Sequence, residues 1–341
     1  YTLLNMGIGN STLYYTAKLP DSRRYILGKS LLVSFVLGVS TLVLLIFSFP
    51  YWHIFYAEIS AVYFLIALFV LPLQLLYNSA FSAIVGADRF DYFSSLRILS
   101  SLFSFLLLCL ALYLPGDKIQ HVLMATLISS LFSLLLSFYY VKRSGILVPS
   151  EVTINVNVGT RQLLTYGLKA HLIGINQYIS YRLDQFLLPI LIGVTALGHY
   201  SVATAITEQV WTLSAAVQMA ILPKIPNRTL KDGARLIATI LPFVFMINIL
   251  IVFVMASMGY FIIPVLFGPE FFASYWPMLL LLPGTFFIGI WKIIGSYYLG
   301  INKFNVLFYL SLAALILNLG FNLWLIPRYS AVGAALASTL S

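Results

Sequence analysis

The sequence predicts an all-α, polytopic membrane protein built from two related halves, and three observations lead to this prediction. Of the 341 residues, 61% are hydrophobic and only 9% are charged, whereas soluble domains carry roughly 25% charged residues. The apolar residues form a series of segments long enough to cross a bilayer, joined mostly by short loops. The chain also aligns with itself, without gaps, at an offset of 214 residues. A soluble globular domain is excluded.

Nine complete membrane-spanning helices are predicted, because a spanning helix needs about 20 mostly apolar residues. They cover residues 27–49, 59–85, 93–114, 119–141, 163–192, 196–220, 236–264, 274–299 and 304–326. Incomplete spans are expected at 1–17 and 331–341. Because the chain begins at Tyr1 and ends inside an apolar run, we expect a fragment that is truncated at both ends.

The longest polar stretch, residues 142–165, divides the predicted spans into two groups. It contains Pro, Gly and polar residues with little helical periodicity, a composition typical of a connecting segment. We therefore predict an N-terminal transmembrane lobe over 1–141 with spans 2–6, its first span being absent. A cytoplasmic linker over 142–165 and a C-terminal lobe over 166–341 follow. That second lobe would hold spans 7–12, the last one truncated.

The basic residues gather in alternate loops. Fourteen of the 19 Lys and Arg residues fall in the loops at 18–29, 86–97, 142–165, 221–235 and 300–305. The intervening loops hold only Lys118 and Arg328. The positive-inside rule places the basic loops in the cytoplasm. The net charge of +9 is therefore a signal of topology, and no nucleic-acid partner is expected.

The internal repeat is clearest at two loops. The segment GADRFD (86–91) aligns with GINKFN (300–305), so that Gly and Phe are kept, Arg becomes Lys and each Asp becomes Asn. Each copy ends one predicted span and opens the next. The offset covers six spans, an even number, so both copies enter the membrane from the same side. Parallel repeats of this kind, related by an axis along the membrane normal, are typical of transporters with a site near the midplane.

Five charged residues fall inside predicted spans: Lys169, Arg182, Asp184, Glu208 and Lys292. A charge at the centre of a spanning helix costs about 2.5–3.5 kcal/mol on insertion scales, so such residues generally face a cavity or a partner. Lys169 lies near the cytoplasmic end of its span, where it can either snorkel to the head groups or line a cavity.

Arg182 and Asp184 are predicted to act separately. Arg182 lies about eleven residues from the turn at Gly193, or roughly 16 Å along the helix, which is close to the bilayer centre. Residues two apart point to nearly opposite sides of a helix, so these two cannot form a local ion pair. If 163–192 and 196–220 form a hairpin, Glu208 comes level with Arg182. We predict an Arg182–Glu208 pair or shared water network lining a cavity; the alternative is an inert pair that fixes helix register.

Several uncharged polar side chains are further candidates for a cavity wall. One face of the span 196–220 carries a polar stripe, which consists of Ser201, Thr204, Glu208, Trp211, Ala215 and Gln218. Lys292 shares its helix face with small residues, which leave room for a substrate or a close neighbour. Its counterpart in the repeat is Asn78, on a face with Gln74.

No catalytic or cofactor motif is visible. The sequence contains no G-x-S-x-G, Walker A or H-E-x-x-H pattern. Cys109 is the only cysteine, and His171 and His199 lack the spacing of metal ligands. We expect no metal, no cofactor, no catalytic residue and no enzyme activity, and ATP-driven transport by this chain alone is excluded.

The segments YRLDQFLLPILIG (181–193) and LFGPEF (266–271), together with the two loop motifs, resemble the multidrug/oligosaccharidyl-lipid/polysaccharide (MOP) exporter superfamily. Within it, the chain is most similar to bacterial polysaccharide-repeat-unit (O-antigen type) flippases. The resemblance implies two six-helix lobes in a V-shaped transporter of the bacterial inner membrane. It implies translocation of undecaprenyl-diphosphate-linked oligosaccharide, a repeat unit of O-antigen, capsule or exopolysaccharide, from the inner to the outer leaflet. Alternating access would be driven by H+ or Na+, with a polysaccharide polymerase as a possible partner.

The same resemblance implies roles for the charged residues. Lys169, Arg182 and Lys292 would attract the diphosphate and acidic sugars, since a dehydrated cavity strengthens such pairs. Asp184 and Glu208 would be coupling carboxylates. Three cations against two carboxylates favour an anionic substrate over the organic cations of a multidrug exporter. An ion-coupled multidrug exporter of the superfamily, or a flippase for lipid II or teichoic-acid precursors, remains the alternative. A membrane-embedded glycosyltransferase or polymerase is disfavoured by outer loops of about ten residues or fewer.

Overall fold

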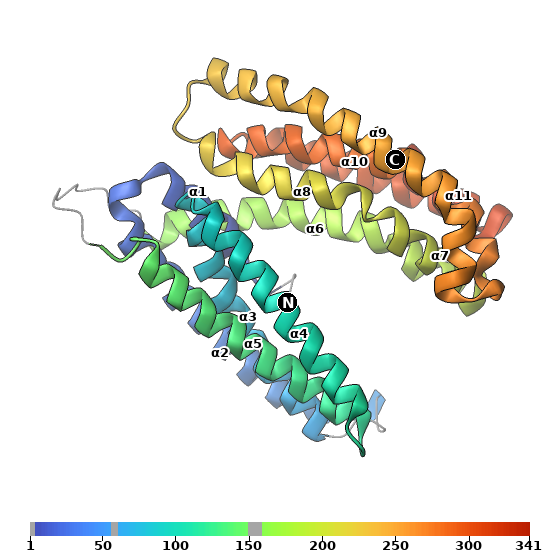
Figure 1. Cartoon of the computed structure of the whole chain (residues 1–341), viewed down its shortest axis with the longest axis horizontal. Coiled ribbons are helices and arrows are strands. Elements are labelled where there is room, and N and C mark those ends of the chain that lie inside the picture. Colours follow the sequence, from blue (N-terminus) through green and yellow to red (C-terminus); the bar gives the residue numbers. More distant parts are fainter. Residues whose placement is uncertain (1–3, 56–60, 149–158) are drawn as a thin grey trace. The chain divides into compact units, whose positions relative to one another are not determined.

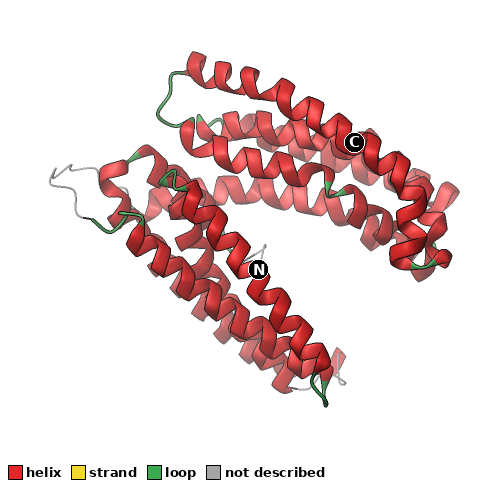
Figure 2. Cartoon of the chain, in the orientation of Figure 1, coloured by secondary structure: helices red, strands yellow, loops and turns green. Residues whose placement is uncertain are grey.

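The computed structural model describes residues 4–55, 61–148 and 159–341. Over these residues the chain is all-helical, with short loops between the helices and no strand (Figure 2). The prediction of an all-α protein is confirmed. Part of the predicted linker, residues 149–158, and parts of the predicted segments 1–17 and 59–85 lie outside the described residues.

The chain divides into two compact units, Tyr1–His171 and Leu172–Ser341. The helices of the first unit are α1 (Ile8–Lys18), the 3-10 helix η1 (Pro20–Ser22), α2 (Arg23–Phe55), α3 (Ala61–Gly86), α4 (Phe90–Tyr113) and α5 (Lys118–Arg143). Within it, α3 packs against α1, α2 and α5, and α4 packs against α5 (Figure 1). The predicted lobe boundaries at 141 and 166 stay a prediction.

Helix α6 (Thr160–Leu191) begins in the first unit and continues into the second. The second unit goes on with α7 (Val194–Thr207), α8 (Val210–Ile221), η2 (Leu222–Lys224), α9 (Leu230–Phe267), η3 (Pro269–Ser274), α10 (Tyr275–Gly300) and α11 (Phe304–Leu340). Helix α10 is its centre, because it packs against α7, α8, α9 and α11. A core that includes Tyr200, Met278 and Ile326, all fully buried, joins α7, α10 and α11.

Seven described helical segments are long and apolar enough to cross a membrane: Pro20–Ser48, Val62–Gly86, Phe90–Tyr113, Lys118–Arg143, Leu230–Phe267, Pro269–Gly300 and Phe304–Leu340. The protein is therefore a multi-pass membrane protein. Two of the nine predicted spans are not among these segments. Helix α6 contains three charged residues in the part predicted to span, and the segment predicted at 196–220 is divided into the shorter helices α7 and α8.

The span predicted at 196–220 is divided into α7 and α8 at Glu208–Gln209, although both residues keep right-handed helical dihedral angles. Hydroxyls near the interruption bond to the backbone: Thr207 Oγ1 donates to Ala203 O at 3.0 Å, and Thr204 Oγ1 donates to Ser201 O at 3.0 Å. The Gln209 amide also donates to Ala205 O. Such side-chain bonds compete with the regular helical ladder. The interruption places Glu208 at the end of α7.

The two copies of the repeat have the same backbone geometry. Asp88 and Asn302, which align at the offset of 214, both adopt the left-handed conformation, with φ of 62° and 60°. Arg89 N donates to Ile84 O and Lys303 N donates to Tyr298 O, over the same number of residues. These bonds form a Schellman cap, in which Asp or Asn takes the position usual for glycine. The sequence repeat therefore corresponds to a repeated structural motif.

This cap gives a first prediction, tested by a matched pair of substitutions. Asn302→Val is expected to destabilise the protein by about 1–2 kcal/mol, because a β-branched residue resists positive φ. Asn302→Gly is expected to be neutral or slightly stabilising, because glycine adopts positive φ freely. Thermal unfolding of the purified protein in detergent checks both. Equal stability of the two variants would contradict the assigned conformation.

Candidate functional site

The second unit contains an open cavity of about 310 Å³ that is lined by residues of α6, α7, α8, α10 and α11. This volume is near the lower limit of ligand pockets, which is about 300 Å³. Its wall carries two carboxylates and several aromatic, amide and hydroxyl side chains. Among them are Asp184, Glu208, Tyr181, Tyr200, Trp211, Phe287, Trp291, Gln177, Asn318, Thr285 and Ser338. Neither Arg182 nor Lys292 belongs to the wall.

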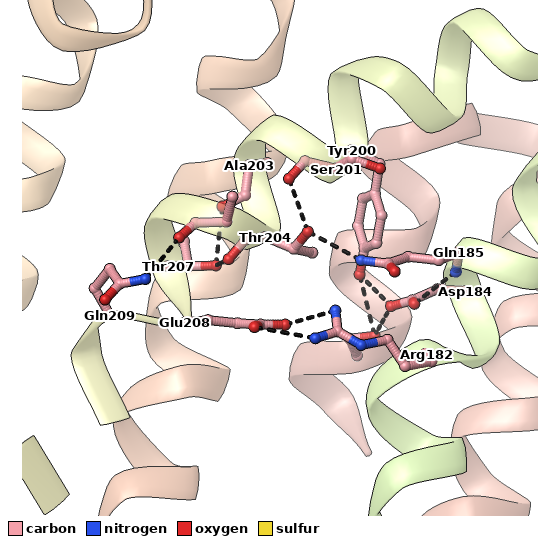
Figure 3. Close-up of polar contacts among 12 residues, drawn as sticks. Arg182, Asp184, Gln185, Tyr200, Ser201, Ala203, Thr204, Thr207, Glu208 and Gln209 are labelled. Carbon is pink, nitrogen blue, oxygen red and sulfur yellow. Dashed lines mark hydrogen bonds and ion pairs between the residues drawn. The ribbon is translucent and has the colours of Figure 1, made fainter. Parts of the chain in front are cut away.

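The predicted pair of Arg182 and Glu208 is formed. Arg182 Nη1 lies 2.8 Å from Glu208 Oε1, and Nη2 donates to Oε2 at 3.2 Å (Figure 3). This two-point geometry is the strong form of a guanidinium–carboxylate interaction. The side chains are 32% and 23% exposed, so the pair is largely withdrawn from solvent. Its role in transport stays a prediction.

Asp184 is not part of this ion pair, because its carboxylate has other hydrogen-bond partners. Asp184 is 2% exposed, and its carboxylate accepts hydrogen bonds from the Tyr200 hydroxyl, from Ser338 Oγ at 2.7 Å and from the Gln185 backbone nitrogen at 2.7 Å. Tyr200 belongs to α7 and Ser338 to α11. Asp184 therefore connects three helices around one carboxylate.

The Lys292 ammonium lies next to two aromatic rings of the site. It lies 5.3 Å from the centroid of the Trp211 ring and 5.9 Å from that of Tyr181. The two rings are 4.9 Å apart with an interplanar angle of 35°. A cation within about 6 Å of a ring centroid is attracted by the ring quadrupole. Both rings line the cavity, so Lys292 stands beside the cavity wall.

The other predicted residues divide between the two units. Thr204 lines the cavity and accepts from Gln185 Nε2 at 3.1 Å, whereas Gln218 does not line it. Gln74 belongs to the first unit, where Nε2 donates to Ser130 Oγ at 3.0 Å. Asn78 and Lys169 also belong to the first unit. The structure thus gathers Arg182, Asp184, Glu208, Lys292, Trp211 and Thr204 at one site in the second unit.

Several residues of the site were missed by the sequence analysis, chiefly Tyr200, Ser338, Asn318 and Trp291. Tyr200 precedes Thr204 by one helical turn and directly adjoins the predicted polar stripe, so the helical period could have included it. Ser338 follows Asp184 by 154 residues, and no local pattern links them. In the described part of the chain, no group of three or more His, Cys, Asp or Glu side chains is arranged to hold a metal ion.

The chain resembles known proteins both in its sequence and in its fold. A sequence model of a family described as "Polysaccharide biosynthesis protein" matches residues 1–227. A search of curated proteins gave no match. The crystal structure of a mutant MATE protein is 14% identical, with a TM-score of 0.85 over 99% of this chain and 82% of that chain.

Two further structures have the same fold. One is an outward-facing MATE-family multidrug resistance transporter of the MOP superfamily, 15% identical, with a TM-score of 0.83 over 99% of this chain and 81% of that chain. The other is a MOP superfamily transporter from Pyrococcus furiosus, described as having a binding pocket of reverse polarity. It is 14% identical, with a TM-score of 0.78 and the same two coverages, 99% and 81%.

The helical fold and the polar cavity define a multi-pass membrane protein with the architecture of MOP-superfamily transporters. The family match covers about two thirds of the sequence. The chain belongs to the polysaccharide biosynthesis protein family.

Proposed function

We propose that this protein is a flippase of the bacterial inner membrane that moves undecaprenyl-diphosphate-linked oligosaccharide from the inner to the outer leaflet. The transported unit is a repeat of O-antigen, capsule or exopolysaccharide, and H+ or Na+ drives alternating access. The basic loops face the cytoplasm in this proposal. The observation that carries it is the match of residues 1–227 to a polysaccharide biosynthesis family, in a chain with a transporter fold.

The charges of the site support a division of labour. Arg182 and Lys292 stand beside the cavity and would attract the diphosphate, with Lys169 as a further cation in the first unit. Asp184 is our candidate for the coupling carboxylate. Its hydrogen-bond donors come from α7 and α11, so a proton or cation bound there competes with contacts that hold these helices together. Glu208 holds Arg182 until the substrate arrives.

A second candidate function is ion-coupled multidrug export. The MATE fold of the structural relatives favours it, as do the two carboxylates among aromatic rings in the cavity wall, because organic cations bind aromatic faces. A flippase for lipid II or teichoic-acid precursors is a closer alternative, since such substrates share the polyprenyl carrier.

Reconstitution of the purified full chain into liposomes tests the flippase. With labelled undecaprenyl-diphosphate oligosaccharide in the inner leaflet, an imposed H+ or Na+ gradient is expected to expose the sugar to an external lectin. Asp184→Asn is expected to remove the gradient dependence, because the amide carries no charge to couple. An unchanged leaflet distribution, together with gradient-driven efflux of ethidium, would reject the flippase in favour of multidrug export.

A further inference from the structure

The charged groups around the cavity cancel before any ligand arrives. The Glu208 carboxylate is held by both terminal nitrogens of Arg182, at 2.8 and 3.2 Å. The Asp184 carboxylate already accepts three hydrogen bonds, out of about four that its lone pairs allow. The Lys292 ammonium adds a second cation beside the wall. Two cations thus balance two carboxylates, and the cavity has no net charge with which to attract a charged substrate.

Both a cationic ligand and an anionic ligand would bind unfavourably inside this cavity. An organic cation would find both carboxylates engaged and the Lys292 ammonium 5.3 Å from the Trp211 ring that it would need. A diphosphate would face the carboxylates of Asp184 and Glu208, which line the wall, whereas Arg182 and Lys292 do not. Like charges brought together at a desolvated site cost several kcal/mol. An uncharged polar ligand meets neither penalty.

The uncharged part of the wall contains two kinds of side chain, aromatic and polar. Tyr181 and Trp211 form an inclined pair of rings, 4.9 Å apart, and Trp291 adds a third aromatic side chain from α10. Amide and hydroxyl groups, including Gln177 and Thr285, line the same cavity. Amides and hydroxyls both donate and accept hydrogen bonds. A sugar ring matches this combination, since one face presents apolar C–H groups and its rim presents hydroxyls that also donate and accept.

We propose that this cavity is the subsite for an uncharged sugar ring of the transported lipid, stacked against the Tyr181–Trp211 pair. The diphosphate of the same lipid then binds outside the cavity, next to Arg182 and Lys292, neither of which belongs to the wall. This inference rests on the proposed flippase function and adds to it the part of the substrate that the second unit binds.

Binding of two tritiated lipids to the purified full chain, measured by scintillation proximity in detergent, tests the subsite. The first lipid is undecaprenyl diphosphate bearing a neutral disaccharide, and the second is the same carrier without sugar. Trp211→Ala is expected to weaken binding of the glycosylated lipid about tenfold, the effect of losing one well-placed aromatic contact. Binding of the sugar-free lipid is expected to change less than about twofold.

Two control variants accompany this measurement. Trp276→Ala removes a tryptophan that is 62% exposed and outside the cavity wall, so both lipids are expected to bind as they do to the unaltered protein. Trp211→Phe keeps an aromatic face and is expected to retain most of the affinity for the glycosylated lipid. It therefore separates loss of the stacking surface from loss of folding, which thermal unfolding of each variant also reports.

Three results would overturn the inference. Equal weakening of both lipids by Trp211→Ala would place the diphosphate in the cavity. Ethidium binding that depends on Trp211, with unchanged binding of the glycosylated lipid, would make the cavity a site for organic cations. Translocation and lipid binding that are both indifferent to Trp211 would remove the subsite while leaving the flippase intact. Conversely, Trp211-dependent sugar binding without translocation would reject the proposed function and retain the subsite.

Discussion

Replacing Arg182 by glutamine is expected to destabilise the protein by about 2–4 kcal/mol, because the Glu208 carboxylate then stays largely withdrawn from water without its partner. Both terminal nitrogens of the guanidinium contact that carboxylate, and glutamine cannot supply two charged donors. The double variant Arg182→Gln/Glu208→Gln removes both charges and is expected to recover most of the lost stability. Thermal unfolding in detergent measures the three proteins side by side.

A surface pair in the same unit provides the control. Arg235 and Asp232 lie 4.0 Å apart with side chains 70% and 50% exposed, and Arg235→Gln is expected to change stability by less than about 1 kcal/mol, since exposed ion pairs contribute little. The double variant also distinguishes a role of Arg182 in substrate binding from a purely structural role of the ion pair. If Arg182 attracts the substrate diphosphate, the folded double variant is expected to lose translocation. Full translocation would show that the pair only fixes the register of α6 and α7.

The contact between Arg182 and Glu208 could be predicted because it is local in the chain. The turn at Gly193, with φ of 133°, joins α6 to α7 directly, so counting residues from that turn brings the two side chains to the same depth. The loop motif was predictable for a similar reason. Its two copies differ at Asp88 and Asn302, yet both residue types adopt positive φ readily, and the cap is therefore kept.

Other parts of the site depend on information that periodicity does not contain. The division between α7 and α8 comes directly after Thr207, whose hydroxyl bonds to the backbone of α7, whereas hydropathy treats this segment as one span. The contact between Ser338 and Asp184 spans 154 residues and requires α11 to turn at Ser330, with φ of 54° and ψ of −133°. A hydrophobic pattern predicts which helices exist, but tertiary packing decides which polar side chains meet.

Gly333→Ala is expected to destabilise the protein by about 3 kcal/mol, at the upper end of the overpacking range. A Cβ at Gly333 would lie 2.2 Å from Leu325 O and 2.6 Å from Leu325 C, and both are backbone atoms that cannot rotate away. The clash falls where α11 folds back at Ser330. The segment after this turn must therefore move, and it carries the Ser338 hydroxyl that donates to Asp184.

Gly320→Ala in the same helix is the matched control, because nothing lies within 4 Å of the added Cβ; alanine is expected to stabilise the helix by up to about 1 kcal/mol. Thermal unfolding distinguishes the two variants. If Gly333→Ala unfolds at the same temperature as Gly320→Ala, Leu325 does not pack against the turn as described. A second comparison adds Asp184→Asn to Gly333→Ala. If Gly333→Ala lowers the unfolding temperature, and Asp184→Asn then costs less stability than it does in the unaltered chain, the displaced segment includes the hydroxyl that stabilises the carboxylate. The sensitivity of Asp184 to Gly333 would then show that the site depends on the turn in α11.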